Sequence, residues 1–297
     1  MTAYKAGLVA LVGRPNVGKS TLLNRILGEH LSIVAPRPQT TRHRIAGIHS
    51  TEQGQIVFLD TPGIHSGQKK ALNRYMNRVA AGSLAEADVV VVIVQAMKLT
   101  DEDRKVIQLA ERAAGKAILV INKVDLVPNK DRLLPFVQEV SMLAAFDAVL
   151  MVCARRGNGF DRLEQALYDA LPESEPLYED DQLTDRSERF LAAEMVREPL
   201  MVMLDEELPY GVTVEIEQFE REGQLLRISA CIWVERDSHK GMVVGKGGQQ
   251  LKRSGQRARE TMERFFQCKV FLKLWVKVRA NWADDERQLA SFGYDDA

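Results

Sequence analysis

Two patterns of apolar residues divide the 297-residue chain. From residue 7 to residue 171, short apolar runs alternate with stretches of helical period, whereas three segments after residue 211 alternate strictly between apolar and other side chains. The first pattern is typical of a doubly wound, mostly parallel α/β sheet, and the second of a sheet with one face buried. A chain of this length exceeds the usual single core, so we predict two domains.

The first pattern predicts strands at residues 7–12, 45–49, 56–60, 89–94, 117–121 and 148–152. Helices are predicted between them at residues 21–27, 69–84, 102–114, 131–146 and 160–171. Ligands of such sheets bind beyond the C-terminal ends of the strands, so motifs at these ends are the first candidates for function.

The first predicted strand leads into residues 13–20, GRPNVGKS. The spacing G-x-x-x-x-G-K-S is that of a P-loop, in which backbone N–H groups and a helix N-terminus cradle the α- and β-phosphates of a nucleotide. We expect Lys19 to reach the β- and γ-phosphates and Ser20 to ligate Mg²⁺. The predicted nucleotide contacts in this segment are Gly13, Asn16, Val17, Gly18, Lys19, Ser20 and Thr21.

Two further segments complete a predicted site for Mg²⁺ and the γ-phosphate. Asp60 and Gly63 form D-x-x-G after a strand, so the carboxylate can hold Mg²⁺ and the Gly63 N–H can contact the γ-phosphate. The polar segment 36–44 is where a first switch loop is expected, and we predict Thr41 as its ligand to metal and γ-phosphate, with Thr40 as the alternative. The predicted metal ligands are therefore Ser20, Thr41 and Asp60, and the predicted catalytic groups are Lys19, Thr41 and Gly63.

The residue after Gly63 is Ile64, at the position where many GTPases have a glutamine that orients the attacking water. Isoleucine has no group that can do this. We therefore expect slow unaided hydrolysis, on the order of 10⁻⁴ to 10⁻² per second.

The identity of the nucleotide base is predicted by a second motif. Asn122, Lys123 and Asp125 form N-K-x-D at the end of another strand. The Asp125 carboxylate can accept hydrogen bonds from N1–H and the N2 amino group of guanine, and adenine lacks both donors. A site built on such hydrogen bonds rejects the wrong base by ~10⁴ or more, so the predicted nucleotide is GTP or GDP. After the last strand, GTPases commonly have S-A-x-x-G; Cys153 departs from this pattern, while the Ala154 N–H is still expected to donate to guanine O6.

The acidic stretch after the first pattern predicts a boundary. Residues 173 to 188 contain seven acidic side chains and one basic side chain, and residues 239 to 264 contain seven basic and two acidic side chains. We predict a G domain at 1–172, an acidic linker at 173–186 and a second domain at 187–297. The second domain is expected to begin with a helix that is kinked or ended at Pro199.

The second domain is predicted to hold a three-stranded sheet, with strands beginning near Val212, Arg227 and Val270. Between the second and third strands, Gly245, Lys246, Gly247 and Gly248 form G-x-x-G, and a long helix follows to Phe266. A helix–GxxG–helix unit clamps the backbone of about four unpaired nucleotides. On the long helix we expect Leu251, Ala258, Met262 and Phe265 to be core residues.

The basic side chains around this loop fall into two groups. Lys246 in the loop, and Lys252 and Arg259 beside the apolar face of the helix, are predicted to contact RNA. Arg253, Arg257 and Arg264 point the other way and fit a solvated surface better than an RNA contact. The predicted RNA-binding residues are thus Gly245, Lys246, Gly247, Gly248, Lys252 and Arg259. The acidic tail around residues 282–287 is expected either to cap the sheet or to compete for the basic groove.

Other features of the chain limit its location and chemistry. The longest fully apolar run, residues 89–94, is far too short to span a bilayer, and residues 1–5 do not begin a signal peptide, so we expect a cytoplasmic protein. Cys153, Cys231 and Cys268 lie far apart, form no metal-binding motif and are expected to be reduced, small core residues.

Six segments together resemble the bacterial Era GTPase family: GRPNVGKS, PQTTRHR, DTPG, NKVD, the GxxG in VVGKGG and the ending WVKVRANWADDERQLASFGY. The resemblance covers the whole chain in order and spacing. It implies a Ras-like G domain fused to a type II KH domain that binds the 3′ end of small-subunit ribosomal RNA during assembly of the small ribosomal subunit. It also implies peripheral association with the inner membrane, for which the sequence shows no anchor. Asn16 resembles the asparagine with which related GTPases seat a potassium ion, and bracing of the loop is its alternative role.

The favoured hypothesis is a GTP-switched, monomeric RNA-binding assembly factor. One alternative is a phosphotransferase that loads a small substrate beside the P-loop, against which N-K-x-D and the lack of a lid-like insertion with clustered arginines argue. Another is an RNA chaperone whose G domain holds nucleotide only as a structural ligand.

Overall fold

The computed structural model describes residues 4–37, 39–63, 70–113, 115–204 and 208–294. Ile64, the residue at the position where many GTPases have a water-orienting glutamine, lies outside the described residues. The chain forms two compact units. Unit 1 consists of Met1–Ser32, Thr41–Ser66 and Met76–Asp185, and unit 2 of Ile33–Thr40, Gly67–Tyr75 and Arg186–Ala297.

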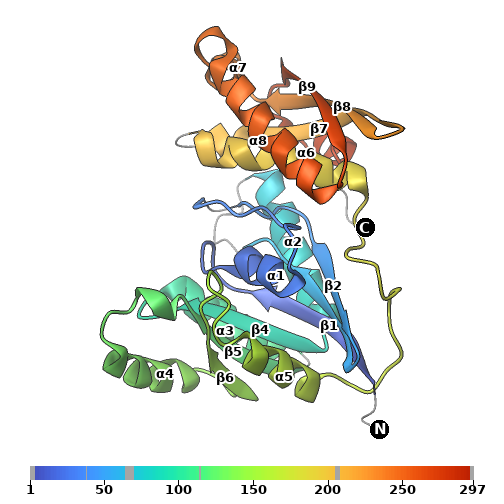
Figure 1. Ribbon diagram of the computed structural model, residues 1–297. Helices are drawn as coiled ribbons and strands as arrows, with labels where there is room; N and C mark the ends of the chain where they lie inside the picture. The colour runs from blue at the N-terminus through green and yellow to red at the C-terminus, as the bar shows by residue number, and fades with distance from the viewer. Residues whose placement is uncertain (1–3, 38, 64–69, 114, 205–207, 295–297) are drawn as a thin grey trace. The chain divides into compact units, whose positions relative to one another are not determined.

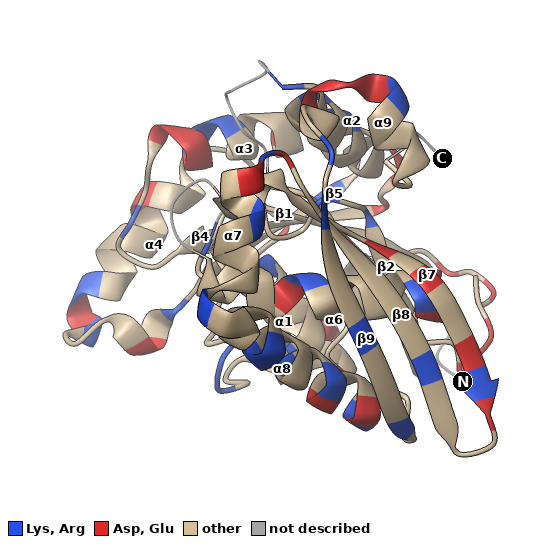
Figure 2. Cartoon of the chain, turned by 90° about the horizontal axis from the view of Figure 1, so that it is seen from above, with Lys and Arg blue, Asp and Glu red and all other residues tan. Residues whose placement is uncertain are grey.

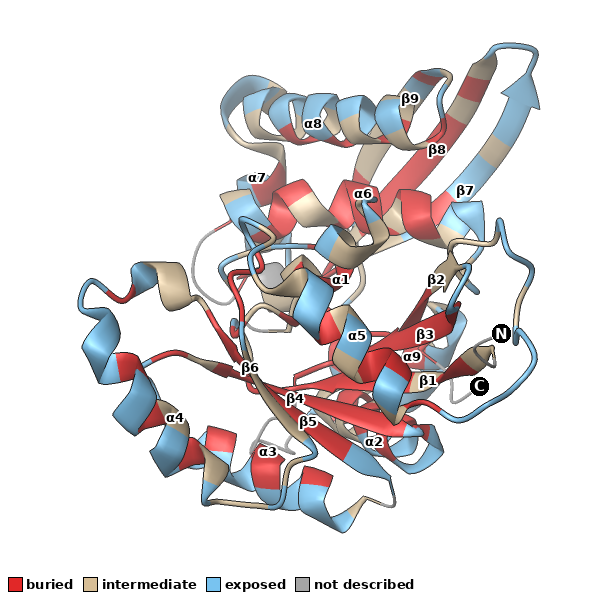
Figure 3. Cartoon of the chain, turned by 60° about the horizontal axis from the view of Figure 1, so that its bottom comes forward, coloured by how far each residue is buried: buried red, intermediate tan, exposed pale blue. Residues whose placement is uncertain are grey.

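Unit 1 is built on a six-stranded sheet in the order β2-β3-β1-β4-β5-β6 (Figure 1). Its strands are β1 (Lys5–Val12), β2 (Ile45–Thr51), β3 (Gly54–Asp60), β4 (Val89–Gln95), β5 (Lys116–Asn122) and β6 (Ala148–Met151). All neighbouring strands are parallel except β2 and β3, so the prediction of a mostly parallel sheet is confirmed. The central strands are buried along nearly their whole length (Figure 3) because helices cover both faces.

The helices of unit 1 are α1 (Lys19–Leu27), α2 (Ala71–Glu86, which begins in unit 2), α3 (Asp101–Arg112), α4 (Leu133–Ser141) and α5 (Phe160–Ala170). Val106 of α3 and Phe136 of α4 pack with β4 and β5 on one face of the sheet. On the other face, α1 and α5 line a cavity of about 180 Å³ over Phe58 of β3. The helix predicted at 131–146 is shorter than expected, because Asn129 caps a separate 3₁₀ turn (Lys130–Arg132) and α4 starts only after it.

The acidic segment up to Asp185 is bound to the β2–β3 edge of unit 1. The buried Gln55 amide accepts hydrogen bonds from the backbone N–H groups of Leu177 (2.8 Å) and Tyr178 (2.9 Å) and donates to the Tyr178 carbonyl. Farther along, the Ile48 N–H donates to the Leu183 carbonyl at 2.9 Å. These contacts hold the segment along the sheet, while the limits 1–172, 173–186 and 187–297 stay predictions.

Unit 2 contains a three-stranded sheet in the order β7-β8-β9, formed by β7 (Val212–Glu222), β8 (Leu225–Val234) and β9 (Lys269–Val278). β7 and β8 form an antiparallel hairpin, and β8 and β9 are parallel. The helices of the unit are α6 (Glu188–Met203), α7 (Asp237–Val244), α8 (Gln249–Phe265) and α9 (Glu286–Ser291). The predicted order helix, strand, strand, helix, GxxG, helix, strand is confirmed.

Two expectations for unit 2 need correction in part. Of the two alternatives for Pro199, the end of the helix is not observed: α6 continues past it, because Met195, Pro199 and Leu200 are all buried and this packing outweighs the missing backbone donor, while the kink stays a prediction. On α8, Ala258 and Met262 are buried as expected, whereas Leu251 and Phe265, in its terminal turns, are only partly buried.

The tail after β9 caps the sheet, one of the two roles expected for it. Trp282 is fully buried, and its indole N–H donates to the Gly211 carbonyl at 3.1 Å. The Tyr294 hydroxyl lies 3.2 Å from the Thr213 hydroxyl at the start of β7. No helix within the described part of the chain is long and apolar enough to cross a membrane.

Candidate functional site

The loop between β1 and α1 has the geometry that phosphate binding requires. Gly18 has φ +109°, and a Cβ there would lie 2.3 Å from the Asn122 amide. A Cβ on Gly13 would lie 2.6 Å from the Ile93 carbonyl, so both positions need glycine. No side chain caps the N-terminus of α1. Its first N–H groups therefore remain available to an anion.

Lys19 is buried within this loop. Its ammonium group donates one hydrogen bond to the Gly13 carbonyl, at 2.9 Å, and a longer one to the Arg14 carbonyl, at 3.4 Å. Burial lowers the pKa of Lys19 to about 8, although the nearby Asp60 carboxylate favours the charged form. The lysine is therefore held by backbone oxygens at the loop where phosphates are expected.

The three predicted metal ligands lie together. The Ser20 hydroxyl donates to Asp60 Oδ2 at 2.8 Å, the Thr41 hydroxyl donates to the same oxygen at 3.2 Å, and the two hydroxyls are 3.1 Å apart. Thr40, the alternative to Thr41, is not part of this cluster, because its hydroxyl donates to the Arg37 carbonyl at 2.7 Å. The hydrogen bonds of the two threonines therefore favour Thr41 over Thr40 as the third member of this cluster.

The cluster fits a magnesium ion. Its donors are two hydroxyls and one carboxylate, which are the hard oxygen ligands that Mg²⁺ prefers. Asp60 is fully buried, and its Oδ1 has no hydrogen-bond partner. Burial raises the pKa of Asp60, and this is opposed by Lys19 and by the hydroxyls of Ser20, Ser32 and Thr41. A cation at Oδ1 would further stabilise the ionised carboxylate. Gly63 lies against the P-loop, since a Cβ there would be 3.1 Å from Pro15.

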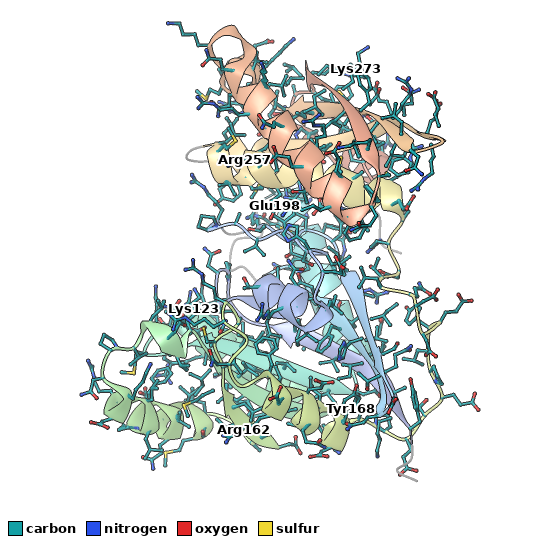
Figure 4. The ribbon with its side chains drawn as sticks, viewed as in Figure 1. Lys123, Arg162, Tyr168, Glu198, Arg257 and Lys273 are labelled. Atoms are coloured by element: carbon teal, nitrogen blue, oxygen red, sulfur yellow. The ribbon has the colours of Figure 1, made fainter. Side chains whose placement is uncertain are left out.

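Asn122 joins three loops of the site. Its amide donates to the Val17 carbonyl of the P-loop at 2.8 Å, and its Oδ1 accepts from the Lys123 N–H at 2.7 Å and from the Ala154 N–H at 3.0 Å. The Ala154 N–H, predicted to donate to guanine O6, is thus engaged by Asn122, and its contact with the base stays a prediction. The side chain of Lys123 (Figure 4) crosses to the P-loop, where it donates to the Asn16 carbonyl at 2.6 Å.

Cys153, which departs from the serine common at this position, lies near the base-reading loop. Interaction of its buried thiol with the Asp125 carboxylate lowers the pKa of that carboxyl. Burial and the same interaction raise the pKa of the Cys153 thiol itself. This interaction favours the ionised form of Asp125, which is the form needed for the predicted contact with guanine.

A buried ion pair behind the P-loop was missed by the sequence analysis. Arg14 Nε donates to Asp103 Oδ2 at 3.0 Å, and the two side chains are 9% and 0% exposed. The same oxygen accepts from the backbone N–H and the hydroxyl of Thr100, the N-cap residue of α3. The pair anchors the P-loop to α3. Only the capping pattern T-x-x-D was visible in the sequence, and it gave no indication of the partner in the P-loop.

The GxxG segment of unit 2 forms an open turn between α7 and α8. Gly245 and Gly247 have φ +70° and +59°. A Cβ on Gly245 would lie 2.7 Å from Gln250, whereas the space around Gly247 is open. No side chain caps the N-terminus of α8. A nucleic-acid backbone can therefore approach Gly247 and the helix N-terminus closely.

The basic side chains near this turn are exposed, in agreement with either a solvated or an RNA-binding surface. They are Lys246, Lys252, Arg253, Arg257, Arg259 and Arg264. In Figure 2, blue bands along α8 mark the lysines and arginines of that helix. The structure brings Lys246 and Lys252 to the GxxG end of the helix, whereas Arg259 lies about two turns beyond Lys252.

Comparison with protein-family models gives two matches. Residues 8–123 match the family described as 50S ribosome-binding GTPase, and residues 207–283 match the KH domain. The first match includes the P-loop, Thr41, Asp60 and Asn122, and the second includes β7, β8, the GxxG turn and β9.

Relatives that are similar over nearly their whole length carry one description, GTPase Era. The chain is 49% identical over 294 residues to that of Stenotrophomonas maltophilia (strain R551-3), covering 99% of each, and 50% identical over 292 residues to that of Xanthomonas axonopodis pv. citri (strain 306), covering 98% of each. The fold matches a crystal structure of Era in complex with MgGDPNP and nucleotides 1506–1542 of 16S ribosomal RNA. It equally matches Aquifex aeolicus Era bound to GDP.AlF4⁻; both have a TM-score of 0.94 and 37% identity and cover 98% of this chain and 99% of the other.

The pKa of Lys19 predicts proton uptake on nucleotide binding. With a pKa of about 8, Lys19 is half deprotonated at pH 8 in the nucleotide-free protein. Phosphate oxygens beside the amine favour its charged form, so we expect binding of GDP with saturating Mg²⁺ to take up about half a proton at pH 8. Affinity should consequently fall as the pH rises above 8.

Calorimetric titrations in two buffers of different ionisation enthalpy measure this uptake. Lys19→Arg is the matched control, since an arginine keeps the cation but does not titrate in this range. We expect the variant to take up about half a proton less than the wild type. Equal uptake by both proteins would contradict the assignment.

Proposed function

This chain belongs to the Era family of GTPases, and from that premise we propose that it binds and slowly hydrolyses GTP and grips single-stranded RNA from the 3′ end of small-subunit ribosomal RNA. The observation that carries the nucleotide half is the convergence of Ser20, Thr41 and Asp60 beside the buried Lys19. The proposed biological role is assembly of the small ribosomal subunit.

The residues of unit 1 divide the work of phosphoryl transfer. We assign Lys19 and the N-terminal N–H groups of α1 to hold the β- and γ-phosphates, and the Gly63 N–H to contact the γ-phosphate. Ser20, Thr41 and Asp60 would hold Mg²⁺, which offsets negative charge on the phosphates when it is bound. Such preorganised donors stabilise the charge that develops in the transition state. Because Ile64 cannot orient water, we expect hydrolysis to be slow without RNA or another partner.

Guanine selection is assigned to the loops that Asn122 holds together. Asp125 accepts from N1–H and the N2 amino group of the base, and the Cys153 thiol favours the ionised form of its carboxylate. Lys123 and Asn16 bring the base loop and the P-loop into contact. GTP and GDP are therefore the proposed ligands, in agreement with the MgGDPNP held by the related Era structure.

The RNA half of the proposal rests on unit 2. Gly245, Lys246, Gly247 and Gly248 form the clamp for about four unpaired nucleotides, with Lys252 and Arg259 beside it. The related Era that was crystallised with nucleotides 1506–1542 of 16S ribosomal RNA supports the choice of RNA. Binding to the small ribosomal subunit, a cytoplasmic location, a monomeric state and peripheral inner-membrane association stay predictions from the sequence and the resemblance.

Single-turnover GTP hydrolysis with and without the RNA tests the function as a whole. A GTP-switched factor should hydrolyse GTP slowly alone and at a different rate with RNA, whereas a protein that holds nucleotide as a structural ligand should show no hydrolysis in either case. A phosphotransferase should transfer the γ-phosphoryl group only to an added acceptor.

The same assay in KCl and NaCl at equal ionic strength tests the proposed potassium site at Asn16. We expect faster hydrolysis in KCl, and equal rates would exclude that site.

Asp125→Asn should shift the preference from GTP toward xanthosine triphosphate. The asparagine amide can donate to the O2 that replaces the guanine N2 amino group, whereas it lacks the charge that favours N1–H and N2. Competition binding with both nucleotides measures the shift. Asp131→Asn, an exposed position on the 3₁₀ turn after the motif, is the control and should leave the preference unchanged. Unaltered GTP affinity in Asp125→Asn would contradict the guanine assignment.

Replacing Lys246 and Gly247 by aspartate should lower RNA affinity at least tenfold. The double variant puts two carboxylates where phosphates must pass, and both positions are exposed, so the fold and GTP binding should persist. Lys246→Ala alone should reduce the salt slope of log K by ~0.7, the increment for one phosphate contact of a single strand. Titrations of 3′-end RNA at several salt concentrations measure both effects. Wild-type affinity in a folded double-aspartate protein would exclude this loop as the clamp.

A further inference from the structure

The outer face of β9 carries aromatic and basic side chains that the GxxG clamp does not use. Along the strand, Val270 and Val276 are buried, and Leu274 packs against Gly255 of α8. The alternate residues point away from the helices, because side chains of a strand alternate between its faces. They are Phe271, Lys273, Trp275 and Lys277, which we call the β9 outer face.

The β9 outer face is continued on β8 by a series of cation–aromatic contacts. Lys273 Nζ lies 5.5 Å from the Trp275 ring centroid. Lys277 Nζ lies 5.8 Å from that ring and 5.4 Å from the ring of Trp233 on β8. At the other end, the Arg227 guanidinium lies 5.5 Å from the ring of Phe271. Such contacts hold the rings in place at a solvent-accessible surface.

Charge is divided across this side of the sheet. The outer positions of β7 are acidic, and Figure 2 shows red bands on β7 where β9 has blue ones. Glu217 pairs with Lys277 at 3.0 Å, and Glu222 pairs with Arg227 at 2.6 Å. Lys273, labelled in Figure 4, has no carboxylate partner within the described part of unit 2. The uncompensated positive charge therefore lies on β9, at the edge of the sheet.

β9 is also the strand beside the predicted clamp. α7 and α8, which the GxxG turn connects, both pack against β9. The opposite side of β9 has no neighbouring strand in the three-stranded sheet. A strand of RNA bound at the turn therefore has a continuous route to the β9 outer face without crossing the acidic strand β7.

We propose that the β9 outer face is a second contact for single-stranded RNA, in which Phe271 and Trp275 stack on bases and Lys273 meets the phosphate between them. The inference rests on the proposed RNA-binding function and extends it to the nucleotides that flank the clamp. Phe271 is 51% exposed and Trp275 is partly exposed, so both rings are accessible. Four residues of strand separate them by about 13 Å, which leaves room for Lys273 to act between two stacked bases.

Single-stranded RNA fits this surface better than other polyanions. Aromatic side chains on a sheet face stack on unpaired bases, as in other sheet-based RNA-binding modules, whereas the bases of a duplex are already stacked on one another. Stacking tolerates any base, so the β9 outer face should add affinity without adding sequence specificity.

The test compares two RNAs from the small-subunit 3′ end, one of six nucleotides that the clamp alone can hold and one of fourteen that extends beyond it on both sides. Phe271→Ala/Lys273→Ala should weaken binding of the longer RNA about tenfold and change binding of the shorter one less than twofold. Lys273→Ala alone should lower the salt slope of log K by ~0.7 with the longer RNA only. Arg221→Ala removes an exposed cation from β7 and is the matched control, expected to change neither RNA.

Equal losses for both RNAs, or no loss for either, would overturn the proposal. The same would follow if the double variant lost binding to vesicles containing phosphatidylglycerol but kept wild-type affinity for the longer RNA, because the surface would then be a lipid contact. If the double variant does not fold by circular dichroism, the salt slope of Lys273→Ala, at an exposed position, decides the question. The Lys246→Asp/Gly247→Asp variant separates the two ideas, since it should weaken binding of both RNAs. If the wild-type protein bound neither RNA, this would instead contradict the proposed function.

Discussion

The nucleotide site depends on the burial of two opposite charges at one edge of the sheet. Lys19 is 7% exposed and Asp60 is fully buried. Burial makes the charged form of each less favourable, lowering the pKa of Lys19 and raising that of Asp60. Ser20 and Thr41 compensate one carboxylate oxygen only, and Oδ1 has no partner. A ligand that brings a cation to Asp60 and an anion to Lys19 removes both deficits, and a magnesium–nucleotide complex has this charge pattern.

Keeping those charges in place requires that several loops hold fixed positions, and side chains rather than secondary structure fix them. Asn122 connects the P-loop, the base-reading loop and the loop at Ala154 through three hydrogen bonds. Arg14 ties the P-loop to Asp103 at the start of α3. Removing one partner of such a buried pair typically costs about 3–5 kcal/mol, because it leaves an uncompensated charge. Asn122 and the pair of Arg14 with Asp103 therefore help to hold the loops of the site in position.

Short motifs and periodicity predicted the parallel sheet and the P-loop segment, because each depends on neighbours in sequence; the role of Thr41 as a ligand stays a prediction, supported by its hydrogen bond to Asp60. Long-range partners had no such signal: Asp103 is 89 residues from Arg14, and Gln55 is 122 residues from Leu177. The end of α6 that was one of two alternatives at Pro199 is not observed, because burial of the helix outweighs the local preference of proline. The Ala154 N–H was predicted to donate to guanine O6, and in the structure it donates to Asn122 Oδ1. A motif alone does not reveal such a side-chain partner.

The division of the chain into units places a boundary inside the predicted switch loop. Ile33–Thr40 belongs to unit 2, where the Arg197 guanidinium donates to the Thr40 carbonyl and Glu198 accepts from the Val34 N–H at 3.0 Å. Thr41, the next residue, belongs to unit 1 and donates to Asp60. Consecutive Cα atoms are only about 3.8 Å apart. While Thr40 stays in place, the Cα of Thr41 can move only on a sphere of this radius around it, so a change of ligand at Asp60 that displaces Thr41 by more than twice this distance must also displace Thr40 and its hydrogen bond to α6.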